Sequence, residues 1–206
     1  MNDFKKHLLW SVPIYESKIT IKKEWAEFSK NCNFKRMISD NGNITKDFYV
    51  LDKLPELKNI ILEHKNNYVY DFLKIKTKFD FYLLNSWITE HKPNDFAHSH
   101  IHANSLLSGV VYLNVPKNSG KIVFTKDYCY NNIFFPNIFI EFEENNHTNC
   151  VDFWFEPKEG DILIFPSRLL HSVEKNLSNQ NRYCLSFNFF VKGEFGNKNE
   201  STLLLK

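Results

Sequence analysis

Two segments near the start of the chain repeat apolar residues at the spacing of an amphipathic helix. Residues 22–31 place Trp25 and Phe28 on one face, and residues 54–73 carry a longer apolar stripe at intervals of three and four. The stripe consists of Leu57, Ile60, Ile61, His64, Tyr68 and Phe72. Because a sheet or another helix must cover such a stripe, we predict two helices that pack against a larger body.

Beyond residue 78 the pattern changes to short apolar runs, rich in Val, Ile, Phe and Tyr and separated by turn residues, which is typical of β-strands. The predicted strands are residues 78–89, 106–115, 121–124, 150–155, 161–165, 170–174 and 182–191. Pro13 lacks a backbone N–H donor, so we predict an edge strand within residues 8–21. Helices followed by a run of strands predict an α+β, mainly β fold whose second half closes into a sandwich or jelly roll.

The length of 206 residues suits one full-sized core, so we expect a single domain. Residues 1–77 should hold the first strand and the helices, residues 78–193 the β core, and residues 194–206 a tail that is frayed or docked on a neighbour. Residues 126–149 are long and rich in Asn. Such a loop on a β scaffold is a candidate binding loop or lid.

Composition and charge exclude several classes of partner. Apolar residues make up 43% and aromatic residues 16% of the chain, as in globular and not in disordered proteins. The formal net charge is only +2 and the lysines are scattered, so we expect no nucleic-acid partner. No window approaches the roughly 18 apolar residues that a membrane-spanning helix needs, and the N-terminus lacks the apolar core of a signal peptide. We expect no membrane partner.

The four cysteines lie far apart and form no CxxC pair, which excludes a zinc ribbon or a thioredoxin motif. They are Cys32, Cys129, Cys150 and Cys184. We expect free thiols in a reducing compartment. Together with the absence of a signal peptide, this predicts a cytoplasmic protein.

Three of the eight histidines, His98, His100 and His102, occupy alternate positions. Alternate side chains of a strand share a face, so His98 with His100, or His100 with His102, could point two imidazoles at one ion. A distant apolar strand ends at Pro166 and is followed by His171, which could supply a third ligand. The remaining histidines, His7, His64, His91 and His147, are interpreted as surface or hydrogen-bonded core residues.

Arg182 and Ser186 lie four positions apart in the last predicted strand, so their side chains share a face. Arg182 could be no more than the solvated start of that strand. Alternatively, its guanidinium offers two parallel donors to a carboxylate, and the hydroxyl of Ser186 adds a further donor for the same anion.

Several of these fragments resemble one enzyme family. One group of fragments resembles the C-terminal half of the iron(II)- and 2-oxoglutarate-dependent oxygenases, in particular those related to prolyl 4-hydroxylases. This group consists of residues 160–165, His171 and residues 182–186. A second group is similar to a family of 2-oxoglutarate oxygenases from bacteria and their phages. It consists of residues 100–105 with 108–112, and residues 165–167 with 171–173. Trp87 and residues 12–14 also match that family's pattern. The resemblance is densest over residues 80–193.

The resemblance implies a double-stranded β-helix, which is a cupin-like jelly roll, with the N-terminal helices as buttresses outside it. It also implies that His100 and His102 are the first two metal ligands and His171 the third. Arg182 would bind the distal carboxylate of 2-oxoglutarate, with Ser186 and Tyr112 as hydrogen-bonding partners. Iron(II), 2-oxoglutarate as cosubstrate and O2 would be the cofactors, and no residue beyond the metal ligands would be catalytic.

The implied reaction couples oxidative decarboxylation of 2-oxoglutarate to hydroxylation of a small-molecule or peptide substrate, such as a prolyl or other amino-acid side chain. The substrate would enter near residues 91–104 and 126–149. A homodimer is compatible with the sequence. Two other interpretations stay open: a jelly-roll binding or structural protein without catalysis, and a three-histidine dioxygenase that does not use 2-oxoglutarate.

One departure from the usual pattern concerns the second ligand. The common non-haem iron centre has two histidines and one carboxylate, and this chain has His102 at the carboxylate position. Three neutral imidazoles leave the centre one negative charge poorer. Two other ligand sets stay open, either His98 with His100, or Asp95 from the preceding loop in place of His102.

Overall fold

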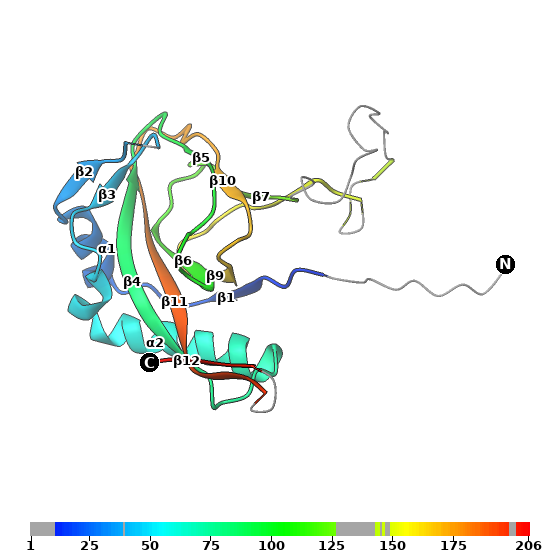
Figure 1. Ribbon diagram of the computed structural model, residues 1–206. Coiled ribbons are helices and arrows are strands. Elements are labelled where there is room, and N and C mark those ends of the chain that lie inside the picture. Colours follow the sequence, from blue (N-terminus) through cyan, green and yellow to red (C-terminus); the bar gives the residue numbers. More distant parts are fainter. Residues whose placement is uncertain (1–10, 39, 127–142, 145, 147–148, 198–200) are drawn as a thin grey trace.

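The structure is a computed structural model that describes residues 11–38, 40–126, 143–144, 146, 149–197 and 201–206. The strands form two antiparallel sheets that face each other (Figure 1). Across the larger sheet the strands follow the order β1 (Tyr15–Lys18), β9 (Asp161–Pro166), β6 (Leu107–Asn114), β11 (Arg182–Asn197), β4 (Asp80–His91), β3 (Asn43–Thr45) and β2 (Phe34–Arg36), and β12 (Ser201–Leu205) pairs with β11.

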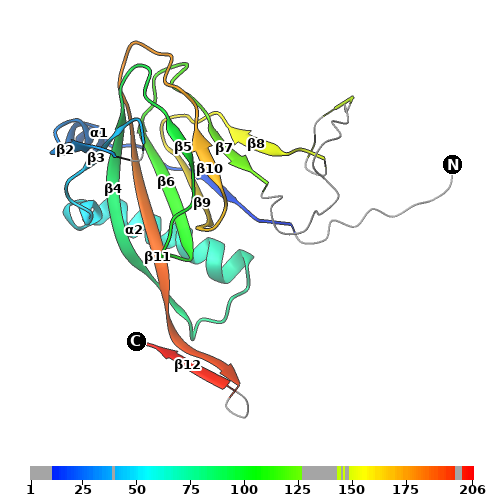
Figure 2. The same ribbon diagram turned by 45° about the horizontal axis from the view of Figure 1, so that its top comes forward.

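The smaller sheet has four strands in the order β5 (Ala97–His100), β10 (His171–Val173), β7 (Ile122–Thr125) and β8 (Asp152–Phe155). Figure 2 shows this sheet lying across β6 and β9 of the larger one. Two facing antiparallel sheets with long-range strand pairing make a jelly roll, so the mainly β prediction is confirmed. The edge strand expected before the helices is β1, at one border of the larger sheet.

The helices lie on the outer face of the larger sheet (Figure 1). They are α1 (Lys23–Lys30), the 3-10 helix η1 (Val50–Lys53), α2 (Pro55–Asn66) and the π-helix η2 (Asn67–Phe72), which continues α2. Pro55 is the first residue of α2, a position where the missing N–H leaves no hydrogen bond unmade. Leu57 and Ile61 of α2 are fully buried against the sheet. The predicted apolar stripe therefore covers the outer face of the larger sheet, except at its end, where Phe72 is 63% exposed.

The larger sheet is buried on both faces, which explains why β6 reads as a continuous apolar run instead of an alternating one. Val111, Leu185 and Phe187 pack outward against the helices. A second apolar cluster fills the space between the two sheets and consists of Val110, Tyr112, Ile122, Phe124, Leu163, Phe165 and Cys184.

Strand β11 lies in the middle of the larger sheet, between β4 and β6. Its side chains alternate between the helix-facing core and the interior. Arg182, Cys184, Ser186 and Asn188 belong to the interior set, since Cys184 packs in the inner cluster while Leu185 belongs to the outer one. The predicted anion-binding pair of Arg182 and Ser186 therefore faces the space between the sheets.

Four short strands were not predicted: β2, β3, β5 and β12. Strands β2 and β3 have three residues each, and β5 is mostly polar, so none produces an apolar run. The segment 194–206, expected to be a tail, instead extends β11 and pairs back on it as β12, from Gly193 opposite Leu205 to Asn197 opposite Ser201. Most of the candidate lid at residues 126–149 lies outside the described residues, as does Cys129.

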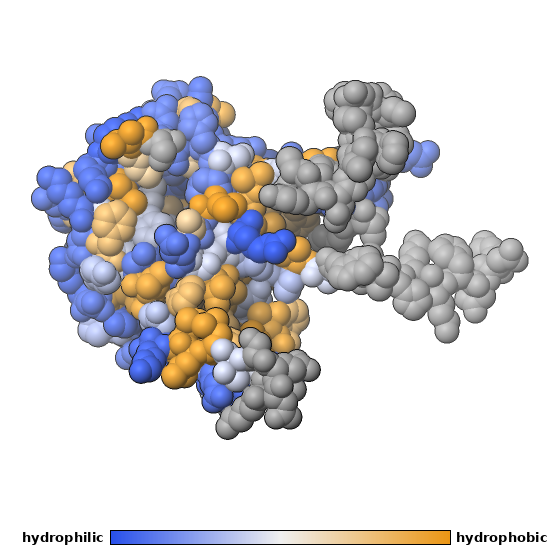
Figure 3. All heavy atoms as spheres, viewed as in Figure 1, coloured by the Kyte–Doolittle hydropathy of each residue, from blue (hydrophilic) through white to orange (hydrophobic). Residues whose placement is uncertain are grey.

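Three cysteines, Cys32, Cys150 and Cys184, are free thiols, as expected. None of the described helices combines the length and the apolar character needed to cross a bilayer. Figure 3 shows apolar side chains gathered on the face that includes the C-terminal hairpin, where Leu203 and Leu204 are 56% and 60% exposed. The hairpin thus presents apolar surface to solvent.

Gly109 of β6 provides a test of how tightly the larger sheet packs. A Cβ at this position would lie 2.4 Å from the ring of Phe187 and 2.6 Å from the carbonyl oxygen of Leu163. We expect Gly109→Ala to lower the free energy of unfolding by about 1–3 kcal/mol through overpacking, measured by urea denaturation. Combining it with Phe187→Leu, which removes the opposing ring atoms, should cost less than the sum of the single changes. Additive losses would show that the ring of Phe187 does not oppose the added methyl.

Candidate metal centre

Three histidines from separate segments meet at one end of the space between the sheets. His100 ends β5 and lies directly opposite His171, the first residue of β10. His102 follows β5 by two residues, and its backbone N–H donates to the carbonyl of Ser167 at 2.9 Å. The ring centroids of His171 lie 4.3 Å from His100 and 5.2 Å from His102. One potential ligand atom from each of the three histidines lies within 4.8 Å of the others.

Each of the three rings is held through Nδ1 by an oxygen atom. The partners are the carbonyl of His98 for His100 at 2.7 Å, the carbonyl of Leu169 for His171 at 2.8 Å, and Oδ1 of Asn188 for His102 at 2.7 Å. Carbonyl oxygens only accept hydrogen bonds, so in the neutral ring Nδ1 carries the proton and Nε2 keeps its lone pair. All three rings therefore present a nitrogen that is ready to bind a metal ion.

Burial keeps two of these rings neutral. His171 is 4% exposed, and burial, followed by the neighbouring His100, lowers its pKa to about 3. Burial also lowers the pKa of His102, and the hydrogen bond that its ring donates to Asn188 opposes that change in part. The neutral imidazole is the form that ligates metals.

A bulge in β5 separates His98 from the cluster. His171 lies opposite His100, and Val173 lies opposite Ala97. The two pairs are three residues apart on β5 but only two residues apart on β10, so β5 contains one extra residue. A bulge of this kind breaks the alternation of side chains that the sequence interpretation assumed. His98 is exposed outside the cluster. The ligand set of His98 with His100 is therefore not the one that the structure assembles.

Carboxylates do not join the cluster: within the described part of the chain, the group of potential ligands consists of histidines alone. Both carboxylate oxygens of Asp95 accept hydrogen bonds from Arg36 at 3.0 Å, and one also accepts from the backbone N–H of Lys92 at 2.9 Å. Asp95 is thus held elsewhere, and the ligand set with Asp95 in place of His102 is not the one that the structure assembles.

Arg182 lies deeper between the sheets, at the start of β11, and is only 1% exposed. Its Nη1 donates to the carbonyls of Ser119 and Gly120, both at 3.0 Å, and its Nη2 donates to Nδ1 of His91 at 2.5 Å. Its Nε has no hydrogen-bond partner, and the same holds for Oγ of Ser119 and Nε2 of His91. Arg182 is therefore a buried cation surrounded by donors that lack an acceptor, not the solvated start of a strand.

Ser186 and Tyr112 line the same inner wall. Ser186 is partly exposed although it lies on a central strand, and its partner on β6, Val110, is buried. Open space therefore lies in front of the hydroxyl of Ser186. Tyr112 is buried, and burial raises the pKa of its hydroxyl above the ordinary value. Along β11, Ser186 lies between Arg182 at one end and Asn188, beside His102, at the other.

Sequence reasoning missed two residues of this region. Asn188 is two positions beyond Ser186, so the alternation of the predicted strand could have placed it on the inner face. His91 is a hydrogen-bonded core residue, as the sequence interpretation allowed, but its partner was not predicted: it lies opposite Arg182 in the pairing of β4 with β11. No local sequence signal indicates that pairing, because the two residues are far apart in the chain.

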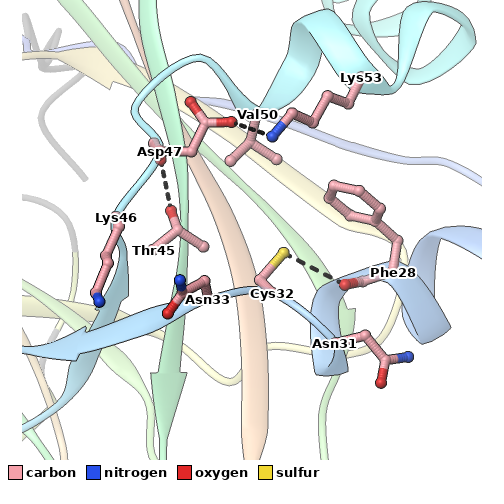
Figure 4. A pocket seen from close by; sticks show the side chains of 9 residues that line it. All are labelled: Phe28, Asn31, Cys32, Asn33, Thr45, Lys46, Asp47, Val50 and Lys53. Atoms are coloured by element: carbon pink, nitrogen blue, oxygen red, sulfur yellow. Dashed lines mark hydrogen bonds and ion pairs between the residues drawn. The ribbon is translucent and has the colours of Figure 1, made fainter.

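Two surface hollows lie away from the histidines. One of about 490 Å³ is formed by α1, the β2–β3 region and η1 (Figure 4), where Lys53 pairs with Asp47 at 2.7 Å and the thiol of Cys32 donates to the carbonyl of Phe28 at 3.3 Å. The other, of about 480 Å³, is lined by residues 115–121, 156–159, 174–175 and 177. Neither includes a residue of the cluster, so chemistry and not cavity size locates the candidate centre.

Comparison with known proteins agrees with this geometry. Residues 85–188, just over half of the chain, match the family described as "Putative 2OG-Fe(II) oxygenase", and the matched segment contains all three clustered histidines together with Arg182. No curated protein matches the chain significantly.

Solved structures share the fold at low sequence identity. A prolyl-4-hydroxylase from Pseudomonas putida has a TM-score of 0.56 and 15% identity, over 90% of this chain and 96% of that one. A 2OG-Fe(II) oxygenase family oxidoreductase from Burkholderia pseudomallei has a TM-score of 0.56 and 12% identity, over 81% and 76%. HygX from Streptomyces hygroscopicus, with nickel and 2-oxoglutarate bound, has a TM-score of 0.59 and 9% identity, over 87% and 83%.

At these identities the structural likeness establishes the fold, which is the double-stranded β-helix expected from the sequence resemblance. The family match establishes membership, because it spans more than half of the chain and includes the segments that form the site. The chain therefore belongs to the family of 2-oxoglutarate- and iron(II)-dependent oxygenases.

Proposed function

We propose that the chain is a dioxygenase that holds iron(II) with His100, His102 and His171 and couples decarboxylation of 2-oxoglutarate to hydroxylation of a substrate. The observation that carries this proposal is the shared arrangement of the three rings, each with Nδ1 bound to an oxygen and Nε2 left free. Imidazole nitrogens suit iron, and three of them leave open positions on the ion. The bound iron(II) and 2-oxoglutarate would supply the oxidising chemistry, in which the 2-oxoacid is converted to succinate and carbon dioxide.

The residues around Arg182 fit the distal carboxylate of 2-oxoglutarate. The backbone carbonyls of Ser119 and Gly120 and the ring of His91 hold the guanidinium in place, and its Nε still lacks an acceptor. Buried donors without partners are costly, and a carboxylate would satisfy them. Ser186 and Tyr112 would complete the anchor.

The inner apolar cluster would keep the reaction dry. Val110, Phe124, Leu163 and Phe165 lie between the two sheets and exclude water from the space near the histidines. In such a site, hydrogen bonds and charges act more strongly than they do in water. The role of this chain's own residues is therefore to orient the two ligands and shield them.

For the substrate we propose a small molecule or a peptide side chain, with a prolyl residue as one candidate drawn from the sequence resemblance. The entrance would lie near residues 91–104, which end at the metal cluster. A binding protein without catalysis and a three-histidine enzyme that ignores 2-oxoglutarate are the competing functions. The buried Arg182 favours the 2-oxoglutarate enzyme over both.

Removing any one of the three histidines should abolish tight metal binding. We expect His100→Ala, His102→Ala and His171→Ala each to weaken iron(II) binding by roughly 100-fold or more, because outer-shell changes alone typically cost 10–100-fold. The measurement is an anaerobic titration with a competing chelator, with circular dichroism to check the fold. His98→Ala is the matched control and should bind iron(II) like the wild type. Wild-type stoichiometry in His171→Ala would remove that residue from the centre.

The role of 2-oxoglutarate can be tested by its chelate with iron(II). Anaerobic addition of both to the wild type should produce a weak visible charge-transfer band, and its absence would contradict the proposed function. Arg182→Ala should weaken 2-oxoglutarate binding by roughly 30-fold or more, since losing a partner of a buried charge pair costs about 2–5 kcal/mol. Ser186→Ala should cost less, about 0.5–1.5 kcal/mol.

A matched probe for this anchor is 2-oxobutyrate, which has the chelating 2-oxoacid group but no distal carboxylate. Its affinity should be the same in the wild type and in Arg182→Ala. Metal affinity without any 2-oxoacid should also be unchanged by Arg182→Ala. An equal loss for both 2-oxoacids would show that Arg182 supports the fold and not the distal carboxylate.

His91 should make the protein sensitive to acid. Burial, and then the positive charge of Arg182, lower its pKa from 6.5 to about 3. Between these values the unfolded chain takes up a proton that the folded chain excludes, so the free energy of unfolding falls as the pH decreases, by up to about 1.4 kcal/mol per pH unit. In His91→Gln the free energy of unfolding, measured by urea denaturation, should fall less steeply between pH 6.5 and 4. The difference in slope should correspond to roughly one proton. Equal slopes in the variant and the wild type would contradict this protonation state.

A further inference from the structure

The His102 ring differs from the other two clustered rings in what holds it. His100 and His171 use backbone carbonyls, whereas His102 uses the side chain of Asn188, with Nδ1 and Oδ1 2.7 Å apart. Asn188 is 5% exposed and sits on β11, the middle strand of the larger sheet. His102 itself lies outside any strand. Its ring is therefore oriented from behind by a buried amide.

The orientation of this amide decides which nitrogen of His102 can bind a metal. With Oδ1 of Asn188 toward the ring, Nδ1 must carry the proton and Nε2 is free. With the amide reversed, its NH2 group would face Nδ1, and Nε2 would carry a proton and could not act as a ligand. The two orientations thus correspond to a metal-binding and a non-binding His102.

The surrounding hydrogen bonds favour the metal-binding orientation. Ser108 is fully buried, and its hydroxyl donates to Oδ1 of Asn188 at 2.7 Å. Nδ2 of Asn188 donates to Oδ1 of Asn85 on β4 at 2.9 Å. The amide oxygen therefore collects two donors, and the amide nitrogen has an acceptor on the opposite side.

A chain of hydroxyls leads to the same amide oxygen. Ser105 lies 2.9 Å from Ser167, Ser167 lies 2.8 Å from Ser108, and Ser108 lies 2.7 Å from Oδ1 of Asn188. Each hydroxyl donates once when the chain runs from Ser105 toward Asn188, and hydrogen bonds aligned in this way strengthen one another. The network joins the loop after His102, the turn after β9, and strands β6 and β11. It ties His102, which no strand fixes, to the larger sheet.

We infer that Asn188 is a positioning residue for the metal centre: its amide oxygen sets the tautomer and the ring orientation of His102. This lets a neutral imidazole serve where the usual non-haem iron centre has a carboxylate. The inference rests on the metal centre proposed above. Acceptors behind a ligating histidine fix its orientation and raise its basicity, and their loss typically weakens metal binding by 10–100-fold.

Three variants test this role through metal affinity, measured by anaerobic iron(II) titration against a chelator. Asn188→Ala removes the acceptor and should weaken iron(II) binding by roughly 10–100-fold. Asn188→Asp restores an acceptor for both His102 and Ser108 and should bind iron(II) at least as tightly as the wild type, with Asn85 turning its amide to donate to the new carboxylate. Ser108→Ala keeps Asn188 but removes one fixing donor, and should cost less than Asn188→Ala.

A spectroscopic measurement separates positioning from a merely structural role. A carboxylate behind His102 makes the imidazole more electron-donating, so in Asn188→Asp the charge-transfer band of the iron(II) and 2-oxoglutarate chelate should move to longer wavelength. Thermal unfolding of the metal-free variants reports any loss of packing. If Asn188 had only a structural role, Asn188→Ala would unfold at a lower temperature, but the folded variant would bind iron(II) as tightly as the wild type.

The outcomes are distinguishable from failure of the proposed function. If the wild type binds no iron(II), the proposed metal centre fails. If the wild type binds iron(II) and folded Asn188→Ala binds it equally well, the positioning role is overturned while the centre stands. If Asn188→Ala does not fold, Asn188→Asp decides, and iron(II) binding weakened 10-fold or more in that variant would overturn the inference.

Discussion

The position of β11 between β4 and β6 is the constraint on which the site depends. Its backbone pairs with β4 over residues 182–192 and with β6 over residues 183–189, and its side chains alternate between the helix-packed core and the interior. A shift of one residue would exchange the two sets, placing Arg182, Ser186 and Asn188 in the apolar core and Leu185 and Phe187 in the interior. The apolar packing of the outer face therefore fixes the register, and the register places these polar residues in the space between the sheets.

The cluster of three histidines depends on both sheets at once. His100 and His171 come from paired strands of the smaller sheet, whereas His102 is held by Asn188 of the larger one. Neither sheet alone brings the three rings together. The serine chain from Ser105 to Asn188 connects the loop that follows His102 to β6 and β11 of the larger sheet, and it substitutes for the strand that His102 lacks.

The sequence predicted the long elements well, because their apolar residues repeat over many positions and leave little ambiguity between helix and strand. It did not predict β2, β3 or β5, which are short and carry few apolar residues. Family resemblance favoured His100, His102 and His171. Spacing alone left His98 open beside His102, since that choice depends on a bulge that only the pairing with β10 reveals. His91 and Asn188 were missed as site residues because their partners, Arg182 and His102, are distant in the chain.

A buried guanidinium and a centre of three imidazoles share one electrostatic property, the absence of a negative charge beside them. Arg182 contacts two backbone carbonyls and the neutral ring of His91, and it forms no ion pair within the described residues. An ion held by three neutral histidines would add a second positive charge without a carboxylate from the protein. Burying unpaired charge is costly, and a dicarboxylate that reaches from one cation to the other relieves both costs. Because linkage is reciprocal, metal and cosubstrate should each raise the affinity of the other by the same factor. In the proposed centre, which has no carboxylate ligand, metal retention would therefore depend on the presence of 2-oxoglutarate.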